Sequence, residues 1–383
     1  MKTQLENYFF EKYHHQPAII VRSPGRVNII GEHADYNNGF VLPAAIDKAA
    51  YIAISLRDDN EIHLTALDLN EQFSTTVDQL KPIGEIRWPN YILGGAAQFL
   101  KRSIKLPGFN AILTSDVPIG AGLSSSAAVE CATVFALNHL LQTNIERVEM
   151  VKMAQKAEHE YAGVMCGIMD QFASMMGKAN QVIKLDCRSL EYEYVPFKLN
   201  GVKIVLLNTN VEHSLASSEY NTRRLECIQA VDMIQKHHPE VHSLRDASVE
   251  MLDQYVLPFN HLVYQRSRFV VDEMARLNLA CQFLQEDNIP ALGNCMFSTH
   301  DGLSAQYEVS CKELDYLVNF VRKREEVIGA RMMGGGFGGC TINLVQEDHI
   351  DSLINDIKPA YEDAMGLKLD YYIATIQNGT EII

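Results

Sequence analysis

The sequence predicts an α+β protein of two lobes, and three observations support this. The chain has 383 residues, which at roughly 100–200 residues per domain corresponds to about two domains. Segments typical of strands and helices follow one another without the regular βαβ order of a doubly wound sheet. The second half is mainly helical. We place the boundary near residues 197–202, which gives an N-terminal domain of 1–197 and a C-terminal domain of 198–383.

In the first half, the expected strands are short runs rich in β-branched and apolar residues, and the expected helices are longer. Strands are expected at 18–21, 51–56, 61–67, 72–77 and 109–113, with a hairpin at 182–185 and 190–195. Helices are expected at 91–101, from the serines before Ala127 to about Leu141, at 145–161 and at 169–176.

In the second half, long helical patterns separate a few apolar strands. Strands are expected at 202–207, 338–345 and 371–375. Helices are expected at 218–236, 258–286, 289–307 and 311–326.

Composition excludes several classes of function. The net charge is −15, from 33 basic and 48 acidic residues, which argues against general binding to nucleic acids or anionic membranes. No run approaches the roughly 18 apolar residues of a membrane span, and the N-terminus has no apolar signal core. The eight cysteines include no C-x-x-C pair and are typical of free thiols. We therefore expect a cytoplasmic protein without a structural zinc site.

The most informative segment is a glycine- and serine-rich loop before a buried helix, PIGAGLSSSAA at 118–128. Unpaired N–H groups and the helix dipole favour an anion at such a helix start, and phosphate is the obvious candidate. The loop lacks the G-K-[ST] ending of a P-loop, so positive charge must come from elsewhere, such as Mg²⁺. The simpler alternative is a glycine turn with serine N-caps on a core helix.

A second glycine-rich segment, MMGGGFGGC at 332–340, leads into an apolar strand. Five glycines in six positions, 334–339, are entropically costly and fit a loop that lies closely against a ligand or another backbone. The alternative is a set of β-bulges at a sheet corner.

A charged cluster near the N-terminus, at 25–39, combines Arg26, Glu32, His33 and Asp35 between glycines. Together these side chains suit a polyhydroxylated ligand and a phosphate. Individually, Arg26 could form a salt bridge, His33 could be a satisfied core histidine, and Asp35 could form an Asx turn. A metal site is a weaker option, because the spacing matches no H-E-x-x-H pattern.

Two further carboxylates are candidates. Glu158 shares the apolar face of its predicted helix with Val151 and Ala154, where a charge is costly unless it is paired or binds a metal. Glu158 is therefore a candidate Mg²⁺ ligand, with a buried ion pair as the alternative. Asp170 could be the N-cap of the next helix or a functional carboxylate, and the local sequence leaves both open.

These motifs together resemble the galactokinase family of the GHMP small-molecule kinases. The resemblance rests on GRVNIIGEHADYNNG at 25–39, PIGAGLSSSAA at 118–128 and MMGGGFGGC at 332–340, supported by segments 157–172 and 217–224. It implies an N-terminal lobe like the second domain of ribosomal protein S5, a C-terminal lobe with a ferredoxin-like α/β sandwich, and an active site between the lobes.

The resemblance also implies roles for individual residues. Arg26 and Asp170 would form the catalytic pair. Ser126 and Glu158 would bind Mg²⁺. The sugar would contact Glu32, His33, Asp35, Gly167, Asp170 and Tyr220. ATP would contact Trp88, Pro118, Gly120, Ala121, Gly122, Leu123, Ser124, Ser125 and Ser126.

The implied reaction is the ATP-dependent phosphorylation of the C1 hydroxyl of α-D-galactose, with galactose and ATP as partners of a monomer or weak homo-oligomer. The sequence has Ala34, Asn38 and Met333 where the family most often has Thr, Gly and Thr, from which we expect altered affinity rather than lost function. The alternatives are a related sugar 1-kinase, such as an N-acetylgalactosamine kinase, and a non-catalytic sensor of galactose and ATP.

Overall fold

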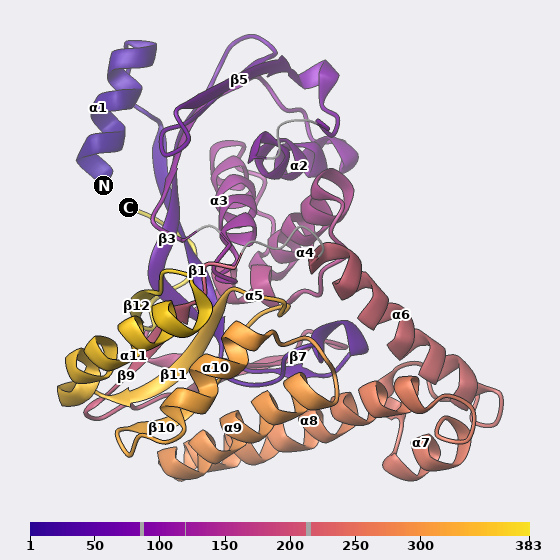
Figure 1. The fold of residues 1–383 in the computed structure, drawn as a ribbon. Helices are drawn as coiled ribbons and strands as arrows, with labels where there is room; N and C mark the ends of the chain where they lie inside the picture. The colour runs from indigo at the N-terminus through magenta and orange to yellow at the C-terminus, as the bar shows by residue number, and fades with distance from the viewer. Residues whose placement is uncertain (85–87, 119, 212–215) are drawn as a thin grey trace.

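The computed structural model describes residues 1–84, 88–118, 120–211 and 216–383 and contains three sheets surrounded by helices (Figure 1). The largest sheet has six strands in the order β13-β1-β3-β6-β4-β5. These strands are β1 (Ile19–Asn28), β3 (Pro43–Leu56), β4 (Glu61–Ala66), β5 (Glu71–Thr76), β6 (Phe109–Ser115) and β13 (Glu381–Ile382). Their pairing is antiparallel except between β4 and β6.

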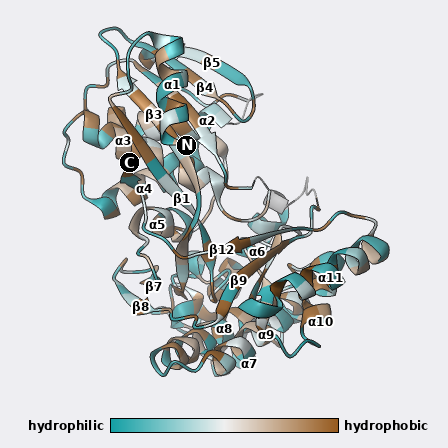
Figure 2. Cartoon of the chain, turned by 90° about the vertical axis from the view of Figure 1, so that its left-hand side faces the viewer, coloured by the Kyte–Doolittle hydropathy of each residue, from teal (hydrophilic) through white to brown (hydrophobic). Residues whose placement is uncertain are grey.

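Helices cover both faces of this sheet because its strands are apolar on both sides. Four helices share an apolar core with one face: α2 (Trp88–Lys101), α3 (Ser125–Leu140), α4 (Arg147–Ala157) and α5 (Met169–Met176). On the other face, α1 (Lys2–Tyr13) buries Leu5 and Phe9 against Ile20, Ala53 and Ile112. In Figure 2, β3 is largely coloured as hydrophobic, whereas α1 carries both hydrophilic and hydrophobic residues.

A second, antiparallel sheet lies in the later part of the chain, with strand order β10-β11-β9-β12. Its strands are β9 (Val202–Asn208), β10 (Val327–Met332), β11 (Cys340–Gln346) and β12 (Asp370–Ala374). Helices α10 (Lys312–Val321) and α11 (Ile350–Met365) share an apolar core with it. Helices α8 (His261–Gln285) and α9 (Ile289–Ala305) lie below it in Figure 1. Helix α6 (Ala216–Gln235) descends at the right of the view toward α7 (Val249–Tyr255).

A third, small sheet joins β2 (Phe40–Val41), β7 (Gln181–Asp186) and β8 (Tyr192–Pro196). The described residues also form 3₁₀ turns at η1 (Asp35–Asn37), η2 (Val77–Gln79), η4 (Leu244–Asp246) and η5 (Glu347–His349). One π-helical turn, η3 (Glu158–Ala162), follows α4 directly.

The α+β class is confirmed, and most predicted elements are present with shifted ends. The strands expected at 18–21 and 51–56 are longer in the structure, because β1 continues to Asn28 and β3 begins at Pro43. The helix expected at 311–326 ends at Val321, and β10 follows it. Helices α1, α7 and α11 and strands β2, β10 and β13 were not among the expected elements.

The domain boundary stays a prediction. Strands that end before residue 197 and strands that begin at residue 202 or later belong to separate sheets, with one exception. The exception is β13, in which Ile382 and Glu381 pair with Val21 and Arg22 of β1. The last residues therefore return to the first sheet.

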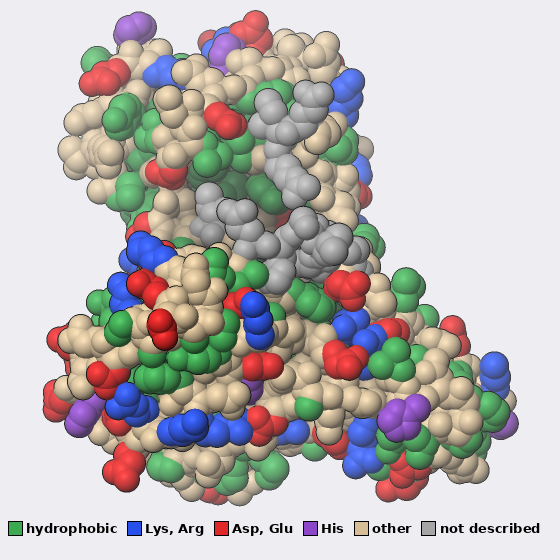
Figure 3. All heavy atoms as spheres, in the orientation of Figure 1, with side chains coloured by type: hydrophobic (Ala, Val, Ile, Leu, Met, Phe, Trp, Pro, Cys, Tyr) green, Lys and Arg blue, Asp and Glu red, His purple; other side chains and the backbone are tan. Residues whose placement is uncertain are grey.

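The surface in Figure 3 carries interspersed acidic and basic side chains, most densely over the lower part of the molecule. Within the described ranges, no helix is long and apolar enough to cross a membrane.

Candidate active site

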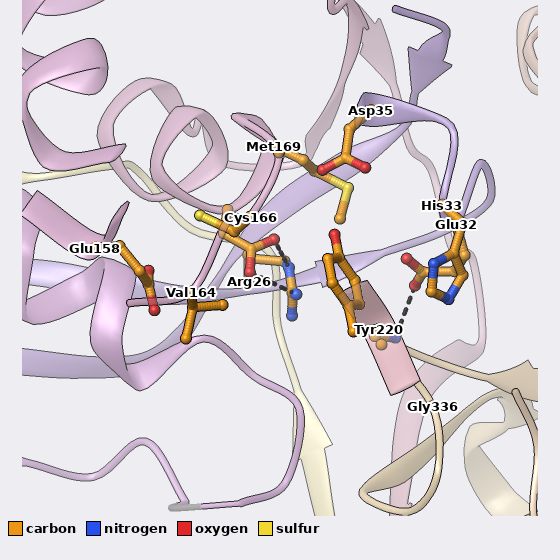
Figure 4. Close-up of a pocket in the computed structure, with 14 residues that line it drawn as sticks. Arg26, Glu32, His33, Asp35, Glu158, Val164, Cys166, Met169, Tyr220 and Gly336 are labelled. Atoms are coloured by element: carbon orange, nitrogen blue, oxygen red, sulfur yellow. Dashed lines mark hydrogen bonds and ion pairs between the residues drawn. The ribbon is translucent and has the colours of Figure 1, made fainter. Parts of the chain in front are cut away.

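A cavity of about 330 Å³ contains most of the polar residues singled out in the sequence (Figure 4). Its lining comes from β1, the segment after it, η3, the start of α5, α6 and the second glycine loop. The lining residues are Arg26, Glu32, His33, Asp35, Glu158, Val164, Cys166, Gly167, Met169, Asp170, Tyr220, Gly334, Gly335 and Gly336.

Arg26 and Asp170 form a bidentate ion pair in this cavity. Arg26 Nε and Nη2 donate to the two Asp170 carboxylate oxygens at 2.8 and 2.9 Å. The Arg26 side chain is 5% exposed and that of Asp170 is 26% exposed, so the carboxylate is the more accessible partner. Burial opposes the charge of Arg26, but Asp170 and Glu32 outweigh it and raise the Arg26 pKa. The guanidinium is thus a permanent cation beside a reachable carboxylate.

The first glycine loop is tied to the same pair. Arg26 donates from its backbone N–H to Leu123 O at 3.1 Å and from its side chain to Gly122 O. Ser124 donates its hydroxyl to Asp170. Ser124 occupies the N-cap position of α3, yet among the described residues no side chain caps that helix. The alternative of a serine side chain capping α3 is therefore not observed at Ser124, and an anion at this helix start would be an acceptor for its N–H groups.

The N-cap interpretation of Asp170 is wrong. The N-cap of α5 is Ile168, and Asp170 lies in the first turn of that helix with its carboxylate on Arg26. The alternative, a functional carboxylate, is the one that fits this position.

Glu32 and His33 lie at the opposite end of the cavity from Glu158 in the view of Figure 4, with Arg26 between them. Glu32 accepts hydrogen bonds from the Gly334 N–H at 2.8 Å and from Arg331 at 3.1 Å. His33 Nδ1 lies 2.8 Å from the Tyr36 hydroxyl. Burial and the positive charge of Arg223 lower the His33 pKa to about 3, so this ring is neutral.

Asp35 and Gly167 meet at one wall of the cavity. Asp35 Oδ1 accepts the N–H of the next residue, Tyr36, at 2.9 Å, and the side chain also lines the cavity. The Asx turn is not formed, because the N–H two residues on, that of Asn37, donates to the Ala34 carbonyl. A methyl group on Gly167 would lie 1.7 Å from Asp35 Oδ2, so any larger residue there would displace the Asp35 side chain. Burial and the nearby Asp170 carboxylate raise the Asp35 pKa to about 7.

The second glycine loop packs against the first. A methyl group on Gly339 would lie 3.4 Å from Ala121 C, and one on Gly334 would lie 3.5 Å from Gly122 O. Gly336 has a φ of +86°, and a methyl group there would lie 2.1 Å from Val309 O. The expectation that this loop lies closely against another backbone is confirmed.

Glu158 is buried where the sequence placed it, in the π-helical turn after α4. Its Oε2 accepts a hydrogen bond of 2.9 Å from Gln171, which also donates to Glu130 at 3.1 Å. Burial raises the Glu158 pKa to about 7, and a hydrogen bond with Ser126 opposes that shift. No ion pair of Glu158 with Lys, Arg or His is found among the described residues, so the predicted buried ion pair with Arg is absent.

This environment suits a hard cation. Ser126 and Glu158 supply the oxygen donors that Mg²⁺ prefers, and a buried carboxylate without a cation is stabilised by one. Within the described part of the chain, no group of three or more His, Cys, Asp or Glu residues is arranged to hold a metal. A Mg²⁺ ion here would therefore take its remaining ligands from a bound phosphate and water.

Of the two aromatic residues predicted to contact ligands, one lines the cavity and the other does not. Tyr220 of α6 lines the cavity, and its ring lies 5.6 Å from that of His33. Trp88 begins α2 and donates its indole N–H to Glu71 at 2.7 Å, and it is not among the residues that line this cavity. Within the first glycine loop, Ile119 lies outside the described residues. The same holds for the segment before α6, at 212–215.

Comparisons with known proteins show the family to which this chain belongs. The chain matches the models for the GHMP kinase N-terminal domain at 90–178, the GHMP kinase C-terminal domain at 282–363 and the galactokinase galactose-binding signature at 7–56. It is 40% identical over 363 residues to a galactokinase of Thermotoga neapolitana, covering 95% of this chain and 99% of the relative. A Fusobacterium nucleatum galactokinase is 39% identical over 93% of both chains.

The chain belongs to the galactokinase family. The crystal structure of Lactococcus lactis galactokinase complexed with galactose matches it over 100% of both chains, with 34% identity and a TM-score of 0.95. A Methanococcus jannaschii mevalonate kinase, 19% identical with a TM-score of 0.67 over 94% of this chain and 98% of that one, shares the fold. The GHMP kinase fold predicted from the sequence is thus confirmed.

Most of the candidate residues of this family member fall inside the matched regions. Arg26, Glu32, His33 and Asp35 lie in the galactose-binding signature. The first glycine loop, Glu158 and Asp170 lie in the N-terminal domain match. Trp88 and Tyr220 lie outside all three matches. Their assignments, like the others, stay predictions.

Sequence reasoning missed several residues that support the site. Arg331 of β10 is fully buried and donates to the backbone carbonyls of Asn28 and Ile29 as well as to Glu32. Glu130 of α3 is fully buried beside Glu158. Glu130 stands four residues after Ser126 on an apolar helix, and this spacing is the signal that could have found it.

Proposed function

We propose that this chain transfers the γ-phosphoryl group of ATP to the C1 hydroxyl of α-D-galactose, giving galactose 1-phosphate and ADP. The observation that carries the proposal is the Arg26–Asp170 pair, which lies between a glycine-serine loop and a cavity lined by polar side chains. Membership of the galactokinase family supports both the sugar and the reaction.

In the reaction, the C1 oxygen forms a bond to the γ-phosphorus as the bond between that phosphorus and the ADP oxygen breaks. Asp170 orients the C1 hydroxyl and accepts its proton, since its carboxylate is the exposed member of the pair. Arg26 stabilises negative charge on the transferred group. Phosphoryl transfer depends mainly on such positioning and charge stabilisation, because its transition state is loose.

The sugar would occupy the end of the cavity opposite Glu158. Glu32, Asp35 and neutral His33 supply acceptors and a donor for its hydroxyl groups, and Tyr220 closes that side. Gly167 leaves room for Asp35 and for the ligand at the wall. This assignment is consistent with the galactose-binding signature over residues 7–56.

ATP would place its phosphates at the start of α3. The backbone N–H groups of Gly120 to Ser126 and the hydroxyls of the three serines would be donors there. We assign Pro118 to a contact with ATP and Trp88 to the vicinity of the adenine. Ser126 and Glu158 would hold Mg²⁺. When bound, Mg²⁺ neutralises phosphate charge and orients the γ-phosphoryl group, which compensates for the missing P-loop lysine.

The protein is expected to act in the cytoplasm as a monomer or weak homo-oligomer whose partners are galactose and ATP. A coupled ADP-release assay with galactose, N-acetylgalactosamine, arabinose and galacturonate tests the function. We expect turnover with galactose. A preference for N-acetylgalactosamine would assign a related sugar 1-kinase, and sugar binding without ADP release would assign a sensor.

A further inference from the structure

A second pocket, of about 420 Å³, lies behind one wall of the sugar cavity. Four basic side chains line it, and we call it the basic pocket: Lys152 and Lys156 of α4, Arg188 of the β7–β8 turn and Arg224 of α6. Asp35 is the one acidic residue among the described lining residues. Four cations converging from three elements are unexpected in a chain of net charge −15.

These cations are available to a ligand. Lys152 and Arg188 form surface ion pairs with Glu149 and Asp246, and their side chains are 41% and 43% exposed. Ion pairs at the surface are weak because water competes with them, so a ligand can replace these two. Arg224 uses Nη1 for the Met165 carbonyl at 2.8 Å, which leaves further N–H donors of its planar fork.

The charge and size of the basic pocket select the class of ligand. A phosphate monoester carries nearly two negative charges and several acceptor oxygens, which match two lysines and two arginines. The pocket is open to solvent and its volume is that of a small molecule. The acidic chain as a whole disfavours a nucleic acid or an anionic membrane.

The basic pocket shares its wall with the sugar cavity. Asp35, Cys166 and Gly167 line both. Side chains of the basic pocket hold the backbone of this wall: Arg224 binds the Met165 carbonyl, while Gln155 and His159 bind the Cys166 carbonyl at 3.2 and 2.8 Å. An anion that fixes these side chains also fixes the wall against which the sugar binds.

We propose that the basic pocket binds a small phosphorylated molecule and that its occupant tightens sugar binding through residues 165–167. The binding step is independent of the proposed function, whereas the coupling step rests on it. Because coupling is reciprocal, the sugar tightens binding of the anion by the same factor.

Calorimetric titration of the full chain with glycerol 3-phosphate and with inorganic phosphate tests the binding step. Saturating ADP is present to fill the first glycine loop, and chloride keeps the ionic strength constant. The test variant is Lys156→Glu/Arg188→Glu, because neither of these side chains binds the backbone of residues 165–166. We expect its Kd for the anionic probe to rise at least about tenfold. Lys198→Glu/Arg324→Glu makes the same charge change at exposed ion pairs outside both pockets and should leave the Kd unaltered.

The two probes distinguish the source of the ligand. Tighter binding of glycerol 3-phosphate indicates a phosphorylated metabolite, and equal or tighter binding of phosphate indicates the free ion. A Kd that the Lys156→Glu/Arg188→Glu variant leaves unchanged would overturn the proposal. So would native protein that binds neither probe.

Galactose titrations with and without glycerol 3-phosphate test the coupling. We expect the galactose Kd to fall about two- to fivefold with the anion, a modest coupling energy. Gln155→Ala removes one bond to the shared wall without altering charge, and it should reduce this effect while anion affinity is retained. An unchanged galactose Kd in native protein would overturn the coupling. Anion binding without ADP release from galactose would overturn the proposed function and leave the basic pocket assigned.

Discussion

Asp170 accepts two hydrogen bonds from Arg26 and one from Ser124. These bonds fix the position of its carboxylate beside the buried guanidinium. Asp170→Asn keeps the shape of the side chain but removes its charge and its ability to accept a proton. We expect kcat to fall by about 10²–10⁴-fold, the usual size of a general acid–base contribution. Galactose and ATP binding, measured by calorimetry, should be retained.

Ser124→Ala is the matched control for this change. It removes one donor to Asp170 and leaves the bidentate pair with Arg26 intact, so kcat should fall by no more than about tenfold. Near-native turnover of Asp170→Asn would rule out its catalytic assignment.

We expect Asp35 to make galactose binding depend on pH. Because burial and the neighbouring Asp170 raise the Asp35 pKa to about 7, the free protein holds this carboxyl protonated at lower pH. Sugar hydroxyls that donate to it require the ionised form. Galactose affinity without ATP should therefore fall as pH decreases below about 7, approaching tenfold per pH unit.

The variant Asp35→Asn should bind galactose more weakly and lose this pH dependence. His33 does not confuse the result, because its pKa is lowered to about 3 and it stays neutral over the range tested. A native Kd that is constant between pH 5 and pH 8 would contradict the assignment of Asp35 as an acceptor.

Among the elements, the second glycine loop most clearly requires a glycine for its backbone conformation. Gly336 has a φ of +86°, and its α-carbon faces the Val309 carbonyl, from which a methyl group would lie 2.1 Å away. Gly336→Ala must displace this loop, which also carries the Gly334 N–H bound to Glu32. We expect a loss of about 1–3 kcal/mol in unfolding free energy and a higher galactose KM.

Gly201→Ala separates the two causes of that loss. Gly201 has a φ of +67° with open space around its α-carbon, so alanine there meets backbone strain without a clash. Urea denaturation of the two variants should show the larger loss for Gly336→Ala. Equal losses, with an unchanged KM, would mean that the close approach to Val309 does not matter.

At this scale the sequence predicted elements whose periodicity or β-branched content is strong, and it missed those stabilised by distant partners. The predicted helix at 169–176 is observed as α5 with the same ends. Helix α1 was missed because only Leu5 and Phe9 are buried, which leaves little periodicity. Strand β10 was missed because it contains Gly329 and the charged Arg331, whose partners lie about 300 residues earlier.

The site was predictable to a similar extent. Motifs close in sequence identified Arg26, Glu32, His33 and Asp35, and the apolar helix face identified Glu158. The pairing of Asp170 with Arg26 spans 144 residues, and local sequence left the role of Asp170 open. Only the fold brings these two side chains together.

Across the whole molecule, the site joins early and late parts of the chain. Strand β1 supplies Arg26, and β10 supplies Arg331, which binds the backbone just after Arg26. Glu32 accepts from both Arg331 and the second glycine loop. The end of the cavity that we assign to the sugar therefore depends on contacts between regions that the sequence assigns to different domains.

Arg331 is the side chain on which this connection depends most. It is fully buried, and its guanidinium satisfies the carbonyls of Asn28 and Ile29 while neutralising Glu32. Arg331→Met introduces an apolar side chain of similar length. It leaves the Glu32 carboxylate and the carbonyls of Asn28 and Ile29 without the hydrogen-bond donors of the guanidinium. Breaking a buried pair in this way costs about 3–5 kcal/mol, which we expect as a loss of unfolding free energy in urea.

Arg324→Met is the matched control, because Arg324 pairs with Asp356 at the surface, where both side chains are at least one-third exposed. Its removal should cost less than about 1 kcal/mol. Galactose affinity should fall in Arg331→Met and not in Arg324→Met, since Arg331 donates to Glu32 and Arg324 makes no contact with it. If both variants unfolded at the same urea concentration, the link between β10 and the segment after β1 would be energetically minor. The sugar cavity would then be positioned by the glycine loop alone, through the Gly334 N–H bound to Glu32.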